Sequence, residues 1–253
     1  MMPVIFVGHG SPMNAVEDNE FTLGWKKIAE SIPVPKVILS ISAHWGTRGT
    51  RVSVVEQPET IHDFYGFPKE LYDIEYKAAG SPEFAAKTIE LLGKTAVEDR
   101  SWGLDHGTWS VLHVMYPDAD IPVFQMSIDM NATPEELFAI GKKLSPLRES
   151  DVLIMGSGNI VHNLGRMEFS EMSGFSWAEI FDKFVYEKIQ QLDFESVLSY
   201  QKMGEFASLS VPTTEHLYPL FYIMGAAEES DTIKTYNRKF MAGSLSMTSY
   251  VFS

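Results

Sequence analysis

Three apolar runs of β-strand type, each followed closely by a histidine, constrain the fold of this chain most strongly. Residues 4–7 precede His9, residues 37–41 precede His44, and residues 152–155 precede His162. Runs that are apolar throughout are typical of strands covered on both faces, as in parallel sheets. Because side chains beyond the carboxyl ends of such strands line one common crevice, we expect the three imidazoles to meet at one edge of a sheet.

Helical and strand-like segments alternate along the rest of the chain. Further strands are predicted at residues 51–55, 123–126 and 246–252, and helices at residues 84–92, 134–143, 176–192 and from Thr213 or Thr214 to residue 227. This alternation predicts an α/β fold, a three-layer sandwich around a central, mostly parallel (mixed) sheet. The last run alternates in polarity, which is typical of an antiparallel edge strand. Since no repeat, low-complexity tract or linker interrupts the pattern, residues 1–253 are expected to form a single domain.

The composition excludes several classes of function. The chain carries 34 acidic against 20 basic residues and no basic cluster, so nucleic acid and anionic membranes are not expected as partners. Because the sequence has no cysteine, disulfides, thiolate metal sites and cysteine nucleophiles are excluded, and a metal would need nitrogen and oxygen ligands. We see neither a basic leader nor an apolar segment long enough to span a bilayer, and therefore expect a cytoplasmic protein.

Each of the three histidines occupies a setting that suits a ligand. Gly8 and Gly10 flank His9, which lets the backbone turn sharply and approach a bound group closely. His44 and His162 also follow small residues. Taken singly, each is explained better as an ordinary core or surface histidine, but together they point to a metal site. Imidazole ligands with open coordination positions suit zinc or non-heme iron.

Other histidines extend this pattern. Glu215 and His216 stand at the predicted start of the late helix, where both could reach a metal. His106 is followed by a glycine and preceded by an aspartate. His62 lies within residues 57–80, the longest stretch without clear periodicity, and such stretches in compact domains are often lids or binding loops.

Six short motifs, taken together and in order, resemble the 4,5-DOPA extradiol dioxygenase family, a branch of the class III ring-cleaving dioxygenases. They are GHGSP at residues 8–12, SAHW at 42–45, HDFYGFP at 62–68, LDHGTW at 104–109, SGN with the following HN at 157–163, and EHLYPL at 215–220. The resemblance covers nearly the whole chain. It implies an α/β sandwich that acts as one catalytic domain, with the active site at one end of the sheet.

The resemblance also implies a ligand set. One divalent metal per chain, Fe(II) in the active enzyme or Zn(II) in isolated protein, is expected on His9 and His44. The wider superfamily uses a glutamate on a late helix as third ligand, whereas this sequence offers Glu215 and His216, of which His216 is the better positional match. His162 matches the superfamily's acid/base histidine, and whether it also coordinates the metal stays open.

The implied reaction is the oxygen-dependent opening of a catechol ring, such as that of a DOPA-like substrate, to a semialdehyde. His162 and His106 are the expected catalytic residues, because an imidazole can remove a phenolic proton and later return it. His62, Tyr65 and Trp45 are the expected substrate-binding residues. Two alternatives remain: a non-catalytic metal-binding relative and a zinc-dependent hydrolase with Glu215 as base. The physiological substrate, 4,5 against 2,3 cleavage, the native metal and the oligomeric state stay open.

Overall fold

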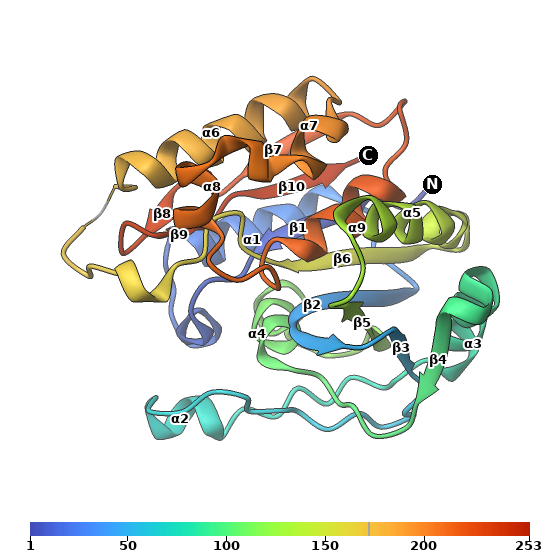
Figure 1. The fold of residues 1–253 in the computed structure, drawn as a ribbon. Coiled ribbons are helices and arrows are strands. Elements are labelled where there is room, and N and C mark those ends of the chain that lie inside the picture. Colours follow the sequence, from blue (N-terminus) through green and yellow to red (C-terminus); the bar gives the residue numbers. More distant parts are fainter. Residues whose placement is uncertain (172) are drawn as a thin grey trace.

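A central eight-stranded sheet with helices on both faces forms the body of the molecule (Figure 1). The structure is a computed structural model that describes residues 1–171 and 173–253. The strands of this sheet, in spatial order, are β4 (Ala96–Asp99), β3 (Thr50–Ser53), β5 (Val123–Asp129), β2 (Val37–Thr47), β6 (Val152–Gly158), β1 (Val4–Gly8), β10 (Ser249–Phe252) and β7 (Ile233–Tyr236). The run β5-β2-β6-β1 is parallel, as is β3-β4, whereas β10 and β7 are antiparallel to their neighbours. The predicted α/β sandwich with a mostly parallel, mixed sheet is confirmed.

The sheet separates two apolar cores because side chains alternate between its faces. Along β1, Val4 and Phe6 belong to one core, and Ile5 and Val7 to the other. The helices are α1 (Glu20–Ser31), α2 (Lys69–Tyr72), α3 (Pro82–Leu92), α4 (His106–Met115), α5 (Pro134–Leu144), α6 (Ser176–Gln190), α7 (Phe194–Leu198), α8 (Glu205–Ser210) and α9 (Tyr218–Ala226). Helices α3, α5, α6 and α9 cover the first core, and α1 and α4 the second.

The predicted helices agree with the structure except at one boundary. Helix α5 begins after Thr133, whose side chain accepts from the Glu136 backbone in a capping box. The late helix begins at Tyr218 and not at Thr213 or Thr214, because the carbonyl of Thr214 accepts from the N–H groups of Leu217 and Tyr218 in a separate turn. His216 therefore lies in a turn just before α9.

The C-terminal run includes an antiparallel strand, as predicted, but the prediction that this strand lies at an edge of the sheet is wrong. Residues 246–252 divide into two strands, β9 (Leu245–Ser246), which pairs with β8 (Phe240–Met241), and β10. Strand β10 is flanked by β1 and β7, so β7 and β4 form the two edges. Both edge strands are short and largely half-buried or exposed, and each contains two consecutive polar residues, so they lack the apolar run that identifies the central strands.

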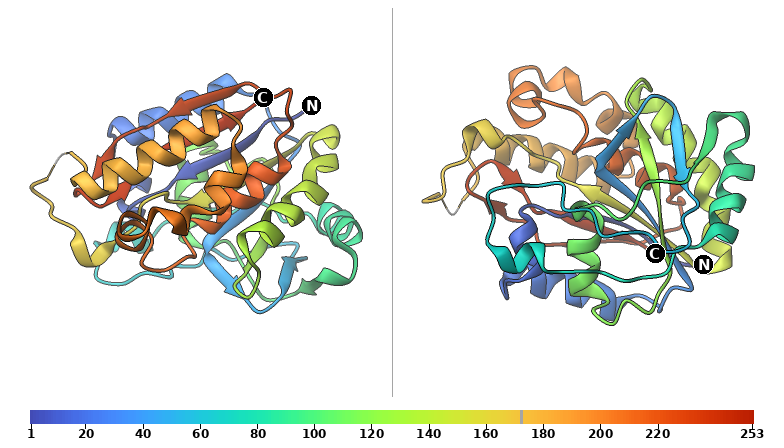
Figure 2. Two further views of the ribbon diagram at one scale, coloured as in Figure 1. Left: turned by 45° about the horizontal axis from the view of Figure 1, so that its top comes forward. Right: turned by 90° about the horizontal axis from the view of Figure 1, so that it is seen from below.

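The topology brings distant segments to one edge of the sheet. Since β1, β2 and β6 are parallel, their carboxyl ends lie together. The two chain termini lie close together at another point of the molecule, as the views in Figure 2 show. Within residues 1–171 and 173–253, no helix has both the length and the apolar character needed to cross a membrane.

Candidate metal centre and active site

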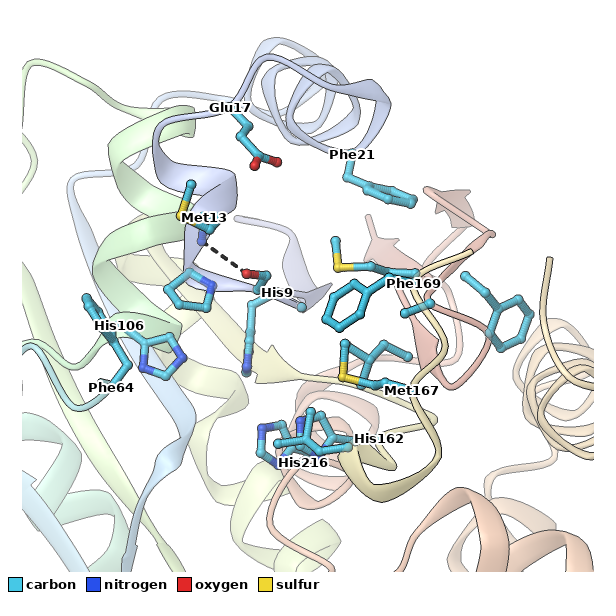
Figure 3. A pocket seen from close by; sticks show the side chains of 18 of the residues that line it. His9, Met13, Glu17, Phe21, Phe64, His106, His162, Met167, Phe169 and His216 are labelled. Atoms are coloured by element: carbon cyan, nitrogen blue, oxygen red, sulfur yellow. Dashed lines mark hydrogen bonds between the residues drawn. The ribbon is translucent and has the colours of Figure 1, made fainter. Parts of the chain in front are cut away.

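Five imidazoles gather where the parallel strands end. His9 follows β1, His44 lies within β2, His106 opens α4, His162 follows β6, and His216 precedes α9. The ring centroids of His9 and His44 lie 5.1 Å apart, those of His44 and His216 5.2 Å, and those of His9 and His216 5.3 Å. Figure 3 shows His9, His106, His162 and His216 around a common space. The convergence predicted from the sequence is thus present.

A bulge in β2 carries His44. Ile41 pairs with Met126 of β5, but the next pair along the ladder joins Gly46 to Ile128. Four residues of β2, 42–45, therefore lie opposite a single residue of β5, residue 127. A strand with such a bulge bends, and its side chains point in new directions. The His44 side chain is half-buried and reaches the other imidazoles from this position.

Backbone contacts fix His9 and His216 against β6. The His9 N–H donates to the carbonyl of Gly158 (3.1 Å), and the Asn159 N–H donates to the carbonyl of His216 (2.8 Å). The side-chain amide of Asn14 donates to the His9 carbonyl (3.0 Å). A Cβ at Gly158 would lie 2.1 Å from the His216 carbonyl oxygen, so this close approach requires glycine.

Ser157 sets the tautomer of His9. The Ser157 hydroxyl donates its single proton to the carbonyl of Gly107 (2.5 Å), which can only accept. Its contact with His9 Nδ1 (3.0 Å) is therefore a donation from the imidazole N–H. The lone pair of the neutral His9 ring is consequently on Nε2, which is the form that binds metals.

Asp63 likewise binds the Nδ1 atoms of two more histidines, His106 and His44. Its Oδ1 accepts from Nδ1 and from the backbone N–H of His106, both at 2.9 Å, and its Oδ2 lies 3.2 Å from His44 Nδ1. Although burial, the largest influence, opposes ionisation, the hydrogen bonds and charges of His106 and His44 lower the pKa of Asp63 well below its usual value. An ionised Asp63 orients both rings with Nε2 toward the cluster.

The resulting arrangement fits a bound divalent cation. Nε2 of His9 and Nε2 of His44 lie only 3.2 Å apart. Although burial opposes protonation, the hydrogen bond and the charge of Asp63 raise the pKa of His44, so a proton on its Nε2 can be donated to the lone pair of His9 Nε2. A divalent cation bound between the two nitrogens would take the place of this proton. Two nitrogens bound to one tetrahedral zinc ion at 2.0–2.1 Å lie about 3.3 Å apart. Burial and the neighbouring imidazoles lower the pKa of His9 well below its usual value, which keeps this ring neutral and able to coordinate.

The candidate ligand atoms form two adjacent groups. Those of His9, His44 and His106 lie within 4.8 Å of one another, and so do those of His162, Glu215 and His216. The predicted ligands are therefore all close together, and His106 lies beside them. Glu215 Oε1 lies 3.1 Å from Nδ1 of His216, so the Nε2 of this ring is the atom left for a metal.

His162 lies beside His216 with its ring stacked at 3.4 Å between centroids. Its backbone N–H donates to the carbonyl of Ser210 (2.9 Å), and it forms a bridge with Leu245. Burial, partly opposed by the charge of Glu215, lowers the pKa of His162 to about 4. This ring is therefore neutral at pH 7 and can accept a proton.

A cavity of about 710 Å³ opens in front of the five imidazoles (Figure 3). Its walls are mostly apolar, and the aromatic and thioether side chains in them are those of Met13, Phe21, Phe64, Phe67, Met167, Phe169, Phe240 and Met241. Phe64 and Phe67 come from the irregular segment 57–80, which agrees with its predicted role as a binding loop. A site of this size and character accommodates a small aromatic molecule.

The three residues expected to bind substrate lie elsewhere. Trp45 is buried and stacks on Trp102 at 5.2 Å, because its neighbour His44 in the strand uses the opposite face. Tyr65 is 92% exposed, and His62 Nε2 bonds to the carbonyl of Ile74 (3.0 Å). Within the part of the chain that the structure describes, none of the three lines the cavity. The prediction that they contact the substrate is therefore corrected.

Asp63 was not singled out in the sequence, and its effect can be measured. Asp63→Asn keeps the shape of the side chain but replaces one accepting oxygen with an N–H₂ group that faces a ring N–H. Loss of such an orienting partner typically lowers metal affinity by about 10- to 100-fold. We expect this loss in competition titrations with a chromogenic chelator. An unchanged affinity would show that Asp63 does not orient the ligands.

Comparison with known proteins agrees with this site. Residues 3–253 match the family model described as the catalytic LigB subunit of aromatic ring-opening dioxygenase. The chain is 43% identical to the 4,5-DOPA dioxygenase extradiol of Escherichia coli, with 98% of this chain and 93% of the relative covered. It is 37% identical to the Beta vulgaris protein of the same name, with 98% and 95% covered.

A solved structure shows the same fold. An uncharacterized protein from Escherichia coli K12 superposes with a TM-score of 0.87 at 38% identity, and the match covers 100% of both chains. Both the family match and these identities extend over almost the whole sequence. The chain therefore belongs to the LigB family of aromatic ring-opening dioxygenases.

Proposed function

We propose that this chain is a metal-dependent extradiol dioxygenase that opens the ring of a DOPA-like catechol and yields a semialdehyde. Residues 1–253 act as one catalytic domain, located in the cytoplasm. The observation that carries the proposal is the convergence of five imidazoles, with Nε2 atoms of His9 and His44 3.2 Å apart, at the inner end of a largely apolar cavity. The relatives named 4,5-DOPA dioxygenase extradiol support the choice of reaction.

His9, His44 and His216 would hold the metal, Fe(II) in the active enzyme or Zn(II) in isolated protein. When bound, Fe(II) brings the catechol oxygens and dioxygen together and allows electrons to pass from the ring to oxygen. All three ligands are imidazoles whose Nδ1 atoms have partners, namely Ser157, Asp63 and Glu215. This departs from the two-histidine, one-carboxylate set of the wider superfamily.

His162 and His106 handle protons. Neutral His162 accepts the proton of a phenolic hydroxyl and later returns it to the opened product. Its position beside His216 and within the cavity lining makes this transfer short. The ring N–H of His106 donates to Asp63, so its Nε2 can accept a hydrogen bond from the second hydroxyl. The apolar walls keep water away from the reacting ring.

The proposal is tested with protein that is stripped of metal and reconstituted with Fe(II) under nitrogen. Oxygen is then admitted with L-DOPA or 4-methylcatechol. We expect one O₂ consumed per ring opened, a yellow product, and both atoms of ¹⁸O₂ in that product. If zinc-loaded protein instead cleaves an ester or amide while the iron form leaves every catechol intact, the hydrolase alternative holds. If neither form turns over any of these compounds, the chain is a non-catalytic metal-binding relative.

The pH dependence of kcat/KM follows from the lowered pKa of His162, which is about 4. A base with a lowered pKa stays neutral, and hence active, to a lower pH than an ordinary histidine with a pKa near 6.5. We expect kcat/KM to stay level from pH 8 to pH 6 and to fall only below about pH 5. Metal content is measured at each pH, because protonated ligands would release the metal. An acid limb near pH 6.5 in fully loaded protein would contradict this assignment.

A further inference from the structure

The charged residues of the cavity all carry one sign. Besides Asp63, which is bound to two histidines, the ionisable non-histidine residues in its lining are Glu17, Glu20 and Glu171. Among the described residues that line the cavity there is no lysine or arginine. The chain as a whole carries a formal charge of −14, so the surrounding field adds to this local charge. A negative substituent on the substrate would meet repulsion without a partner.

Glu17 is the carboxylate best placed to meet a ligand. Glu20 is paired with the ammonium group of Lys239, and Glu171 accepts from the backbone and hydroxyl of Ser173. The Glu17 carboxylate accepts a long hydrogen bond, 3.4 Å, from the side-chain amide of Asn19. Figure 3 shows the Glu17 carboxylate at the rim of the cavity, above Met13 and beside Phe21.

The backbone near the rim offers no substitute for a basic residue. The N-terminus of α1 would ordinarily attract an anion. Here the side chain of Asn19 already accepts from the N–H groups of Phe21 and Thr22, both at 3.0 Å, and the Asn19 carbonyl accepts from Leu23. The helix start is therefore satisfied internally, and a substrate carboxylate gains no hydrogen bond there.

Aromatic side chains in the same part of the cavity favour a cation. Phe21 and Phe169 line it together with the thioether of Met167 (Figure 3). An ammonium group is attracted to the face of an aromatic ring and to a nearby carboxylate at the same time. A carboxylate is attracted to neither. The lining thus combines a negative rim with aromatic rings. The ammonium group of Lys239 beside it is already paired with Glu20, and the described lining residues include no lysine or arginine that could pair with an anion.

We propose that the catechol opened by this protein carries a protonated alkylamine and no carboxylate, with Glu17 as the residue that selects it. This inference rests on the proposed function, since it concerns the substituent of the same catechol. Glu17 acts on binding of the side chain and takes no part in ring opening. The substrate class is therefore the catecholamines, in preference to catechol acids and to the zwitterionic DOPA.

The test compares four catechols that differ in charge: dopamine, 4-methylcatechol, DOPA and 3-(3,4-dihydroxyphenyl)propionate. With the Fe(II)-loaded enzyme at low salt, we expect kcat/KM for dopamine to exceed that for the propionate by about tenfold or more. The ratio should shrink at 0.5 M salt, because salt screens charges near the surface. Dissociation constants of dopamine and the propionate, measured by calorimetry on zinc-loaded protein under nitrogen, should show the same order.

Variants assign the preference to Glu17. Glu17→Gln should lower kcat/KM for dopamine about three- to tenfold and leave 4-methylcatechol unchanged. Glu30→Gln is the matched control, because Glu30 is exposed on α1, the helix that follows Glu17, but does not line the cavity. Arg166→Gln tests the exposed cation nearest in sequence to the lining residue Met167.

The outcomes separate this inference from the proposed function. If 4-methylcatechol is opened but the propionate or DOPA equals or exceeds dopamine, the inference is overturned while the dioxygenase assignment stands. A preference for the propionate that disappears in Arg166→Gln would overturn it in favour of an anion site at Arg166. If no catechol is opened, the proposed function fails, and the calorimetric order of dopamine and the propionate still decides the charge preference.

Discussion

Replacement of His9 or His44 with alanine is expected to empty the metal site and to abolish ring opening. The two Nε2 atoms lie 3.2 Å apart, so each variant removes one ligand from a pair that one cation would bridge. Removal of a partner behind a ligand costs about 10- to 100-fold in affinity, and removal of the ligand itself should cost more, about 1,000-fold. Metal content per chain, measured by plasma emission spectrometry, should fall from about one to below about 0.1.

His113→Gln is the matched control for these variants. His113 is half-buried on α4 and contacts the ring of Tyr76 at 6.4 Å, outside the residues that line the cavity. This variant should keep its metal and its activity. Circular dichroism spectra of all the variants should coincide with that of the parent chain, since the imidazoles contribute little to either apolar core. Full metal content in both His9→Ala and His44→Ala would refute the proposed centre.

Replacement of His162 is expected to have the second-largest effect, and to affect turnover and not metal content. General acid–base catalysis by one side chain contributes about 10²- to 10⁴-fold, so kcat should fall by that factor in His162→Ala. The metal should stay, because His9, His44 and His216 still provide three nitrogen ligands. Stopped-flow measurement of the single-turnover rate, with metal content determined on the same sample, gives both quantities.

His162→Gln serves as a second variant that preserves packing. The His162 ring stacks on His216 at 3.4 Å, and alanine would leave a gap beside that ligand, whereas glutamine fills most of it. Both variants should lose kcat to a similar extent, and the acid limb of the pH profile should disappear with the base. If either variant loses its metal while retaining the parent fold, His162 is a ligand and its proposed role as base is wrong.

The sequence predicted the central part of the fold well because its strands are buried on both faces. Residues 4–7, 37–41 and 152–155 all fall within β1, β2 and β6, and their uninterrupted apolar character follows directly from that burial. The edge strands β4 and β7 are half-exposed, and because they contain polar residues they do not show the continuous apolar run from which the central strands were predicted. Without β7, the position of β10 could not be inferred, since pairing partners along the chain are not encoded in local polarity.

The candidate site was predicted to a similar degree. His9, His44 and His162 are brought together as expected, because the carboxyl ends of parallel strands share one edge, and His216 joins them from the turn before α9. Asp63 was missed, although it follows His62 in a segment already regarded as a binding loop. Its role depends on a three-dimensional contact with rings from β2 and α4, for which residue spacing gives no sign. The burial of Trp45 likewise depends on its partner, Trp102.

The position of β1 inside the sheet has a consequence for biosynthesis. Val4 pairs with Ile154 on one side and with Phe252 on the other. The strand that leads into His9 is therefore synthesised long before the two strands with which it pairs. Sheets that depend on such remote pairings form slowly and after translation of most of the chain. Capture of the metal should therefore come late in maturation, and the rate of metal uptake during refolding should report completion of the sheet.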